Sequence, residues 1–163
     1  MLHVRLRFRF LWSAAGRNFP VTEAAFVTEQ TTRLVFPSHI EAVADAAAAA
    51  TDFARECGLS EEAVFGMDMA VREAITNAVV HGNKEDESKE VEVSFNCSRH
   101  AIEIEVKDQG AGFDPAVVPD PTAPENLLKT SGRGNFLIRN FMDEVQWSSR
   151  QEGGTTVRMI KRF

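Results

Sequence analysis

The stretch Met67–Asn83, MDMAVREAITNAVVHGN, decides how the rest of the chain is interpreted. Its periodicity predicts a helix that ends at Gly82. Glu73, Asn77 and His81 are spaced four residues apart, so they share one stripe of that helix. A neighbouring apolar stripe faces the core and consists of Met67, Val71, Ala74 and Ala78. The small residues that extend the polar stripe, which we expect to leave room for a ligand, are Gly66 and Ala70.

A carboxylate one helical turn before an amide suits metal–phosphate chemistry. The Glu73 carboxylate can take a proton from an attacking hydroxyl, and the Asn77 amide oxygen is a hard, neutral ligand of the kind that Mg²⁺ accepts. The same pair also occurs on ordinary solvated helix faces, so it needs support from the rest of the chain. His81 has two interpretations: it satisfies the last helix carbonyls, or it contacts a phosphate or a metal.

Composition limits the classes of protein to consider. The 163 residues, 44% hydrophobic and 26% charged, predict a globular protein with one main domain. A net charge of −6 without a basic block in the main body argues against duplex nucleic acid as a partner. Cys57 and Cys97 are far apart in the sequence, which indicates neither a zinc site nor a disulfide framework and fits the cytoplasm. No run approaches the roughly 20 apolar residues of a transmembrane segment.

Residues 1–30 form an N-terminal extension, and the compact domain spans residues 31–163. The extension contains HVRLRFRFLW, in which apolar residues alternate with arginines. The arginines interrupt the apolar stretch that a secretory signal requires, so export is not expected. The extension is either loosely attached, or an artefact of the chosen start site, or an arm that binds a membrane surface or a partner.

The order of elements in the compact domain predicts an α+β two-layer sandwich, with a mostly antiparallel sheet and helices on one face. A short strand precedes a helix that a Ser38–Glu41 capping box starts and Gly58 stops, and Ser60 caps the next helix. After them come two hairpin strands, a long proline-rich loop, a helix and two final strands. Their expected ranges are Arg33–Phe36 for the first strand, Lys89–Asn96 and Ala101–Lys107 for the hairpin, Pro115–Ser131 for the loop, Gly132–Phe141 for the helix, and Glu144–Ser149 and Thr155–Arg162 for the last strands.

Two glycine motifs follow buried elements. In Asp108-Gln-Gly110-Ala-Gly112, the glycines let a planar ligand approach, and the carboxylate can accept a hydrogen bond from an exocyclic amine such as that of adenine. The alternative is an ordinary glycine turn. The second motif, Ser131-Gly132-Arg133-Gly134-Asn135, runs into a helix whose free N–H groups can bind phosphate oxygens. Its alternative is a helix start with flexible glycines.

Thr155 begins the last strand on the inward face, together with Val157 and Met159. A buried hydroxyl needs a partner. That partner is either the backbone of the threonine itself or a bound base, directly or through water.

Taken in order, ExxxNxxxHGN, DxGxGF, a proline-rich loop, GxGxF…MDEV and GGTTV resemble the N, G1 and G2 boxes of the GHKL ATPase superfamily. The wording REAITNAVVHGN and NFLIRNFMDEV most resembles the anti-sigma factor serine/threonine kinases. The resemblance extends from about Thr32 to the C-terminus, and its strength lies in the order and spacing of several motifs. The N-terminal extension has no counterpart in the usual short chain of these kinases.

The resemblance implies a Bergerat-type sandwich that holds Mg-ATP between helices and sheet. Residues 115–131 correspond to the ATP lid, and Asn135 replaces a residue that is more often apolar. The positions that match the family's functional residues are Glu73 as catalytic base, Asn77 as magnesium ligand, Asp108 with Gly110 and Gly112 at the adenine amine, Ser131, Gly132, Arg133 and Gly134 at the phosphates, and Thr155 near the base. Arg133 can reach the γ-phosphate or a partner's surface.

The resemblance also implies an activity and partners. The chain would be a kinase that phosphorylates a serine or threonine of a STAS-domain anti-sigma factor antagonist, sequesters a sigma factor and forms a homodimer. A first alternative is a module that binds ATP and a partner without phosphotransfer. A second is a fragment of a histidine kinase with His39 as acceptor, although the chain has no room for a separate two-helix dimerisation domain.

Overall fold

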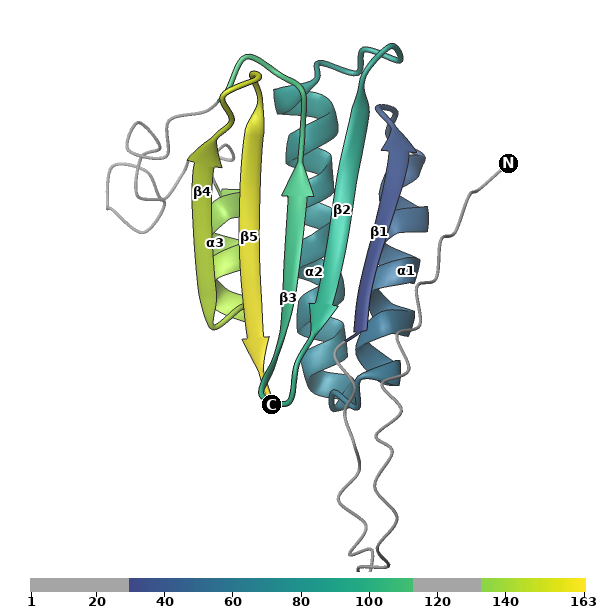
Figure 1. Ribbon diagram of the computed structural model, residues 1–163, viewed down its shortest axis with the longest axis vertical. Coiled ribbons are helices and arrows are strands. Elements are labelled where there is room, and N and C mark those ends of the chain that lie inside the picture. The colour runs from purple at the N-terminus through teal and green to yellow at the C-terminus, as the bar shows by residue number, and fades with distance from the viewer. Residues whose placement is uncertain (1–29, 113–132) are drawn as a thin grey trace, which may run out of the picture.

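The computed structural model describes residues 30–112 and 133–163. The predictions for the N-terminal extension, the proline-rich loop, Ser131 and Gly132 lie outside these ranges. Within them, three helices, one π-helical turn and five strands follow one another (Figure 1). In chain order they are β1 (Gln30–Pro37), α1 (Ala42–Glu56), α2 (Glu61–Thr76), η1 (Asn77–Gly82), β2 (Glu90–Cys97), β3 (Ala101–Lys107), α3 (Arg133–Phe141), β4 (Glu144–Ser149) and β5 (Thr155–Arg162).

The sheet has the order β1-β2-β3-β5-β4, and every neighbouring pair is antiparallel. The helices cover one face of this sheet, as Figure 1 shows, so the predicted two-layer α+β sandwich is confirmed. The register of the strands brings buried side chains of neighbouring strands side by side. Phe95 pairs with Ile104 and Ile104 with Met159, and all three side chains are buried. Alternate residues of these strands therefore meet the helices in rows across the sheet.

Helix α2 lies in the middle of the helical layer and buries the predicted apolar stripe. Met67 and Val71 are fully buried, and Ala74 and Ala78 nearly so. Ser60 caps the helix, because its Oγ accepts a hydrogen bond of 3.3 Å from the N–H of Ala63, as the sequence predicts.

The room beside Gly66 and Ala70 belongs to a helix and not to a ligand, so that prediction is wrong. A Cβ at Gly66 would lie 2.9 Å from Cδ1 of Phe141, and Ala70 is fully buried. Phe141 also meets Phe65 edge-on, with the ring centroids 6.3 Å apart. The small residues thus let α3 pack closely against α2.

The start of α1 also differs from the prediction. The helix begins at Ala42, its N-cap residue is Glu41, and no side chain caps it. Ser38 instead lies buried in the preceding turn, where its N–H donates to the carbonyl of Lys89 at 3.1 Å. This bond ties Ser38 to the start of β2, so the chain needs three more residues before it becomes helical.

Helix α2 does not continue as a regular α-helix to Gly82. Residues 77–82 form the π-helical turn η1, in which the N–H of Asn83 donates to the carbonyl of Ala78, five residues back, at 2.8 Å. His81 in this turn is exposed, whereas Glu73 and Asn77 are half-buried. The expected end at Gly82 is confirmed, but the segment after Thr76 is π-helical and not α-helical.

The two cysteines are neighbours in space, although the sequence separates them. Phe53 of α1 contacts Phe95 of β2 at a centroid distance of 5.4 Å. Cys57 follows one helical turn later, and Cys97 follows two strand residues later on the same buried face. Because α1 and β2 run in the same direction (Figure 1), the two thiols lie close to each other. Burial, together with the Cys97 thiol, raises the pKa of Cys57.

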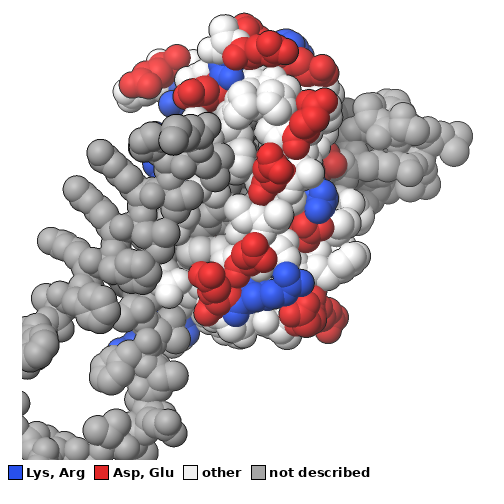
Figure 2. Space-filling view, turned by 90° about the vertical axis from the view of Figure 1, so that its right-hand side faces the viewer, with Lys and Arg blue, Asp and Glu red and all other residues white. Residues whose placement is uncertain are grey.

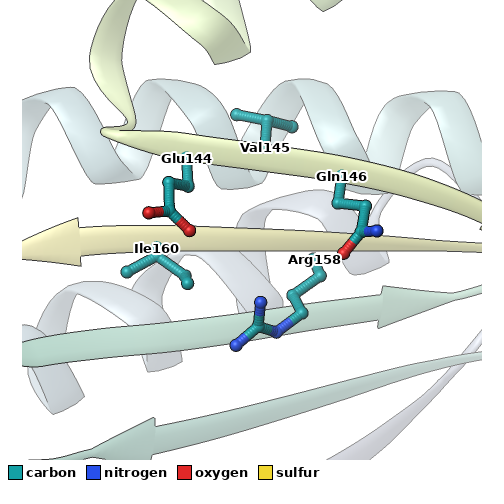
Figure 3. Close-up of a pocket in the computed structure, with 5 residues that line it drawn as sticks. All are labelled: Glu144, Val145, Gln146, Arg158 and Ile160. Atoms are coloured by element: carbon teal, nitrogen blue, oxygen red, sulfur yellow. The ribbon is translucent and has the colours of Figure 1, made fainter.

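The face of the sheet opposite the helices, here called the outer face, carries ion pairs. Arg158 pairs with Glu103, and Lys107 lies 2.9 Å from Glu105 and 3.5 Å from Glu92. A hollow between β4 and β5 opens mainly onto this face (Figure 3); its lining residues are Glu144, Val145, Gln146, Arg158 and Ile160. Its two charged side chains are already paired, Glu144 with Arg162 and Arg158 with Glu103, so it is a poor candidate for the functional site.

Candidate functional site

Glu73 and the start of α3 meet directly. A Cβ at Gly134 would lie 1.7 Å from Oε1 of Glu73, so no other residue fits there without a shift. Two glycines make this contact possible. Gly66 of α2 leaves space for Phe141 at one end of α3, and Gly134 leaves space for Glu73 at the other end. The structure therefore brings together two residues that the sequence predicted from separate motifs, a candidate base and a candidate phosphate contact.

The amino-terminal end of α3 is suited to an anion. The first N–H groups of a helix have no partners within the helix, and the helix dipole favours negative charge there. Asn77 opens η1 one turn after Glu73, and the side chains of both are partly accessible. A carboxylate, an amide oxygen and a helix N-terminus thus lie on one side of the helical layer, which is the donor set that a metal-bound phosphate group requires.

Asp108 lies buried at the end of β3, with 6% of its surface exposed. Its Oδ1 accepts hydrogen bonds from the N–H of Gly110 at 2.8 Å and from the N–H of Thr155 at 3.1 Å. Its own N–H donates to the carbonyl of Thr155 at 3.0 Å. Among the described residues, no hydrogen bond reaches Oδ2. The carboxylate is thus held by one oxygen, and the other can accept a bond from a ligand.

The chain packs against Asp108 from two sides at backbone distance. A Cβ at Gly82 would lie 2.6 Å from Cγ of Asp108, and a Cβ at Gly154 would lie 2.1 Å from its carbonyl oxygen. A Cβ at Gly110 would in turn lie 2.2 Å from the carbonyl oxygen of Gly82. The end of η1, the loop after β3 and the β4–β5 turn therefore form one tightly closed corner.

Asn83 is a site residue that the sequence analysis missed. It is fully buried, and its amide donates from Nδ2 to the carbonyl of Glu90 at 3.0 Å and accepts at Oδ1 from the N–H of Gln109 at 2.8 Å. Gln109 completes the connection, because its Oε1 accepts from the N–H of Glu90 at 2.9 Å. The sequence feature that could have identified Asn83 is its place directly after Gly82, the glycine that ends the helix. A polar side chain at such a position commonly bonds to the backbone.

Arg150, in the turn between β4 and β5, is a second missed residue. Its Nη1 donates to the carbonyl of Asp108 at 2.7 Å. In sequence it is one arginine before the turn QEGG, and nothing in that pattern links it to a residue 42 positions earlier.

The other predicted positions are placed as follows. Thr155 is buried with Val157 and Met159, so the predicted inward face is confirmed, and its backbone pairs with Asp108. Gly112 has a φ of +92°, which favours glycine. Arg133 is the first residue of α3, and Ser131 and Gly132 lie outside the described residues.

One side of the molecule is mainly acidic (Figure 2), in line with the net charge of −6. Figure 2 shows the side of the molecule that carries α1 and β1, where acidic side chains predominate over basic ones. The exposed acidic residues of α1 and its ends include Glu41, Asp45, Asp52 and Glu56. The basic residue Arg55 lies on the same helix and pairs with Glu61. None of the helices in the part of the chain that the structure describes is long and apolar enough to cross a membrane.

Comparison with known proteins agrees with this geometry. Residues 36–161 match the sequence profile of the histidine kinase-like ATPase domain. The chain is 39% identical over 103 residues to an anti-sigma F factor of Heyndrickxia coagulans, which covers 60% of this chain and 69% of that protein. It is 33% identical over 131 residues to the serine-protein kinase RsbW of Oceanobacillus iheyensis, covering 77% and 82%. An anti-sigma F factor of Clostridium botulinum is 33% identical over 139 residues, covering 83% and 96%, whereas that of Bacillus subtilis is matched over 65% of its length.

Proposed function

Because the chain belongs to the histidine kinase-like ATPase family, among the anti-sigma factor serine/threonine kinases, we propose that it transfers the γ-phosphate of ATP to a partner protein. The domain that does so begins near residue 31. The observation that carries the proposal is the contact between Gly134 and Glu73. It sets a carboxylate against the N-terminus of α3, so a proton acceptor and a phosphate-binding helix end serve the same point in space.

The base of ATP fits the corner around Asp108. The carboxylate is buried and fixed through Oδ1, so Oδ2 can accept a hydrogen bond from the exocyclic amine of adenine. Gly110 and Gly112 keep side chains away from the plane of the base. Thr155 lies directly beside Asp108, which is the position expected for a second contact with the base.

The phosphates fit the opposite part of the site. The N–H groups at the start of α3 would bind phosphate oxygens, with Ser131, Gly132, Arg133 and Gly134 as the contacts. Asn77 would hold a magnesium ion, which supplies neutralisation of phosphate charge when it is bound. Glu73 would orient the hydroxyl of the acceptor and take its proton at a carboxylate oxygen as the hydroxyl oxygen bonds to the γ-phosphorus. The bond between the γ-phosphorus and the β–γ bridging oxygen breaks in the same step, and ADP leaves.

The names of the relatives suggest the partners. Serine-protein kinase and anti-sigma F factor are the names of proteins that the chain matches over most of their length. We propose that the acceptor is a serine or threonine on a STAS-domain antagonist, that the chain also sequesters a sigma factor, and that it acts as a homodimer.

The test is phosphotransfer from Mg-ATP to a panel of STAS-domain proteins from the same genome, followed by intact mass. One added phosphate on a partner is expected, with the rate reduced by about a hundredfold or more in Glu73→Gln. Asn77→Ala should reduce it as well. Glu103→Gln is the matched control, because Glu103 lies on the outer face, where it pairs with Arg158. Equal rates in Glu73→Gln and the wild type would contradict the role of Glu73.

The non-catalytic binding module is the competing function. It predicts that ATP binds, that no partner is modified and that Glu73→Gln changes nothing. The closeness of Gly134 to Glu73 favours the kinase, because a module that only binds nucleotide has no need of a carboxylate against its phosphate helix.

The histidine kinase fragment receives less support. His39 lies in the short turn between β1 and α1, with Nδ1 3.2 Å from Oε2 of Glu41, and not in a helix. The histidine kinase alternative predicts acid-labile phosphate on the protein itself, and this phosphate should be absent from the His39→Gln variant.

A further inference from the structure

The peptide unit between Asp108 and Gln109 is held from both of its edges. Its carbonyl accepts a hydrogen bond of 2.7 Å from Nη1 of Arg150, and its N–H donates one of 2.8 Å to Oδ1 of Asn83. The two side chains come from different parts of the fold, the end of η1 and the β4–β5 turn. A peptide plane that is fixed at both edges cannot rotate, so the backbone on either side of it keeps one orientation.

Arg150 is well placed to hold this plane because it is itself fixed. Its N–H donates to the carbonyl of Gly154 at 3.0 Å, and its carbonyl accepts from the N–H of Gly153 at 3.2 Å. Its side chain is 26% exposed, and Nη2 lies 3.7 Å from the exposed carboxylate of Glu152. The same turn touches Asp108 through Gly154. The guanidinium thus reaches Asp108 from a rigid base and not from a flexible loop.

We propose that Arg150 is a positioning residue for recognition of the base: by holding the carbonyl of Asp108, it keeps the carboxylate of Asp108 aimed at the exocyclic amine. This inference rests on the proposed function, since it assumes that the corner binds the base of ATP. After Asp108 the chain continues Gln-Gly-Ala-Gly, and the two glycines offer little resistance to rotation. Without Arg150, the carbonyl loses a charged donor and turns towards another donor or water, and the carboxylate turns with it.

The experiment measures discrimination between two nucleotides by titration calorimetry. The probes are Mg-ATP and the magnesium complex of purine riboside triphosphate, which lacks only the exocyclic amine. A hydrogen bond to a charged group predicts that the wild type prefers ATP by about tenfold or more. In Arg150→Met this preference should fall to less than about threefold, while affinity for the purine analogue stays close to that of the wild type.

Three variants serve as controls. Arg150→Lys keeps one cationic donor and should restore part of the preference. Glu152→Gln should leave the preference unchanged, because the exposed Glu152 lies against Nη2, whereas Nη1 holds the carbonyl of Asp108. Arg158→Met removes an arginine of the same hairpin that faces Glu103 on the outer face and should have no effect. Thermal unfolding of each variant shows whether it is folded. If Arg150→Met does not fold, the comparison of Arg150→Lys with the wild type still tests the proposal.

Several results would overturn the inference. If Arg150→Met lowers affinity for both nucleotides by the same factor, Arg150 supports the fold and not recognition of the amine. If the variant keeps the full preference for ATP, Asp108 needs no help from Arg150. If the wild type binds neither nucleotide, or binds both equally, the proposed base site is wrong and the role of Arg150 falls with it.

Discussion

The two ends of the sheet are closed in different ways. At the end where β3 finishes and β5 begins, backbone meets backbone around Asp108, and glycine is the residue that fits at Gly82, Gly110 and Gly154. At the opposite end, side chains close the turns: Oγ of Ser98 donates to the carbonyl of Ala101 at 3.0 Å, and Oδ2 of Asp143 accepts from the N–H of Arg162 at 2.6 Å. One end is rigid because its atoms have no space, and the other is held by replaceable polar contacts.

A pair of glycine substitutions tests this difference most strongly. Gly154 and Gly58 both have positive φ, +94° and +85°, but an added Cβ would meet the carbonyl of Asp108 at 2.1 Å in the first case and nothing within 4 Å in the second. Gly58→Ala should lower the free energy of unfolding by about 1 kcal/mol, from backbone strain alone. Gly154→Ala should lower it by about 3 kcal/mol or more, because strain and overlap add.

Urea unfolding of both variants measures these costs. Equal losses in the two glycine variants would show that the corner around Asp108 yields more easily than its geometry indicates.

A pair of polar substitutions gives the next largest effect. Asn83→Ala leaves the carbonyl of Glu90 and the N–H of Gln109 without their partner, which should cost about 2 kcal/mol and weaken ATP binding. Ser98→Ala, at the opposite end, should cost about 1 kcal/mol or less and leave nucleotide affinity unchanged. Urea unfolding and titration with Mg-ATP measure both quantities. A loss of nucleotide affinity in the Ser98 variant would remove the functional distinction between the two ends.

The pH dependence of stability concerns Asp143. The N–H of Arg162, assisted by the Lys161 ammonium, holds the pKa of this carboxyl below its usual value. A lowered pKa in the folded state means that the contribution to stability is present above the unfolded pKa of about 4 and disappears as pH falls through the folded pKa. Asp143→Asn should therefore cost about 0.5–1 kcal/mol at pH 7, allowing for solvent screening.

The difference between wild type and Asp143→Asn should shrink as the urea midpoint is followed from pH 6 down to pH 3. A difference that stays constant over this range would mean that the charge of Asp143 contributes nothing.

The smallest effect is chemical and leaves stability unchanged. Burial and the neighbouring Cys97 raise the pKa of Cys57, so little thiolate is present at neutral pH. Alkylation of Cys57 by iodoacetamide should be about tenfold slower in the folded protein than in urea. Cys97→Ala removes one cause but not the larger one, burial, so it should accelerate the reaction only in part. Peptide mass mapping gives both rates, and equal rates in the folded protein and in urea would contradict the shift.

Local patterns were enough to predict most of the fold. The alternation in Ala101–Lys107, Glu144–Ser149 and Thr155–Arg162 gives the same bounds as the strands of the structure, because each has one face turned towards the core, which is buried in β3 and β5 and half-buried in β4. The capping box at Ser38 failed because a non-local bond to Lys89 competes for that turn. The prediction of a regular α-helix through His81 was wrong, because the spacing of apolar residues does not reveal a single π turn.

The candidate site divides in the same way. Glu73, Asn77, Asp108 and Thr155 belong to short motifs in which each residue type suggests its chemistry. Asn83 and Arg150 act through contacts with residues from 7 to 42 positions away, and these depend on how the elements pack. A pattern along the chain carries no record of such contacts.

The π turn at residues 77–82 sets the direction in which the residues after it point. A π turn amounts to an α-helix with a single residue inserted. If the same residues were wound as an unbroken α-helix, every later position would rotate by about 100° relative to Asn77. Asn83 would then point away from Gln109 and Glu90 even though no residue had been replaced. Between Asn77 and Asn83, the winding of the backbone is therefore as much a part of the site as any side chain.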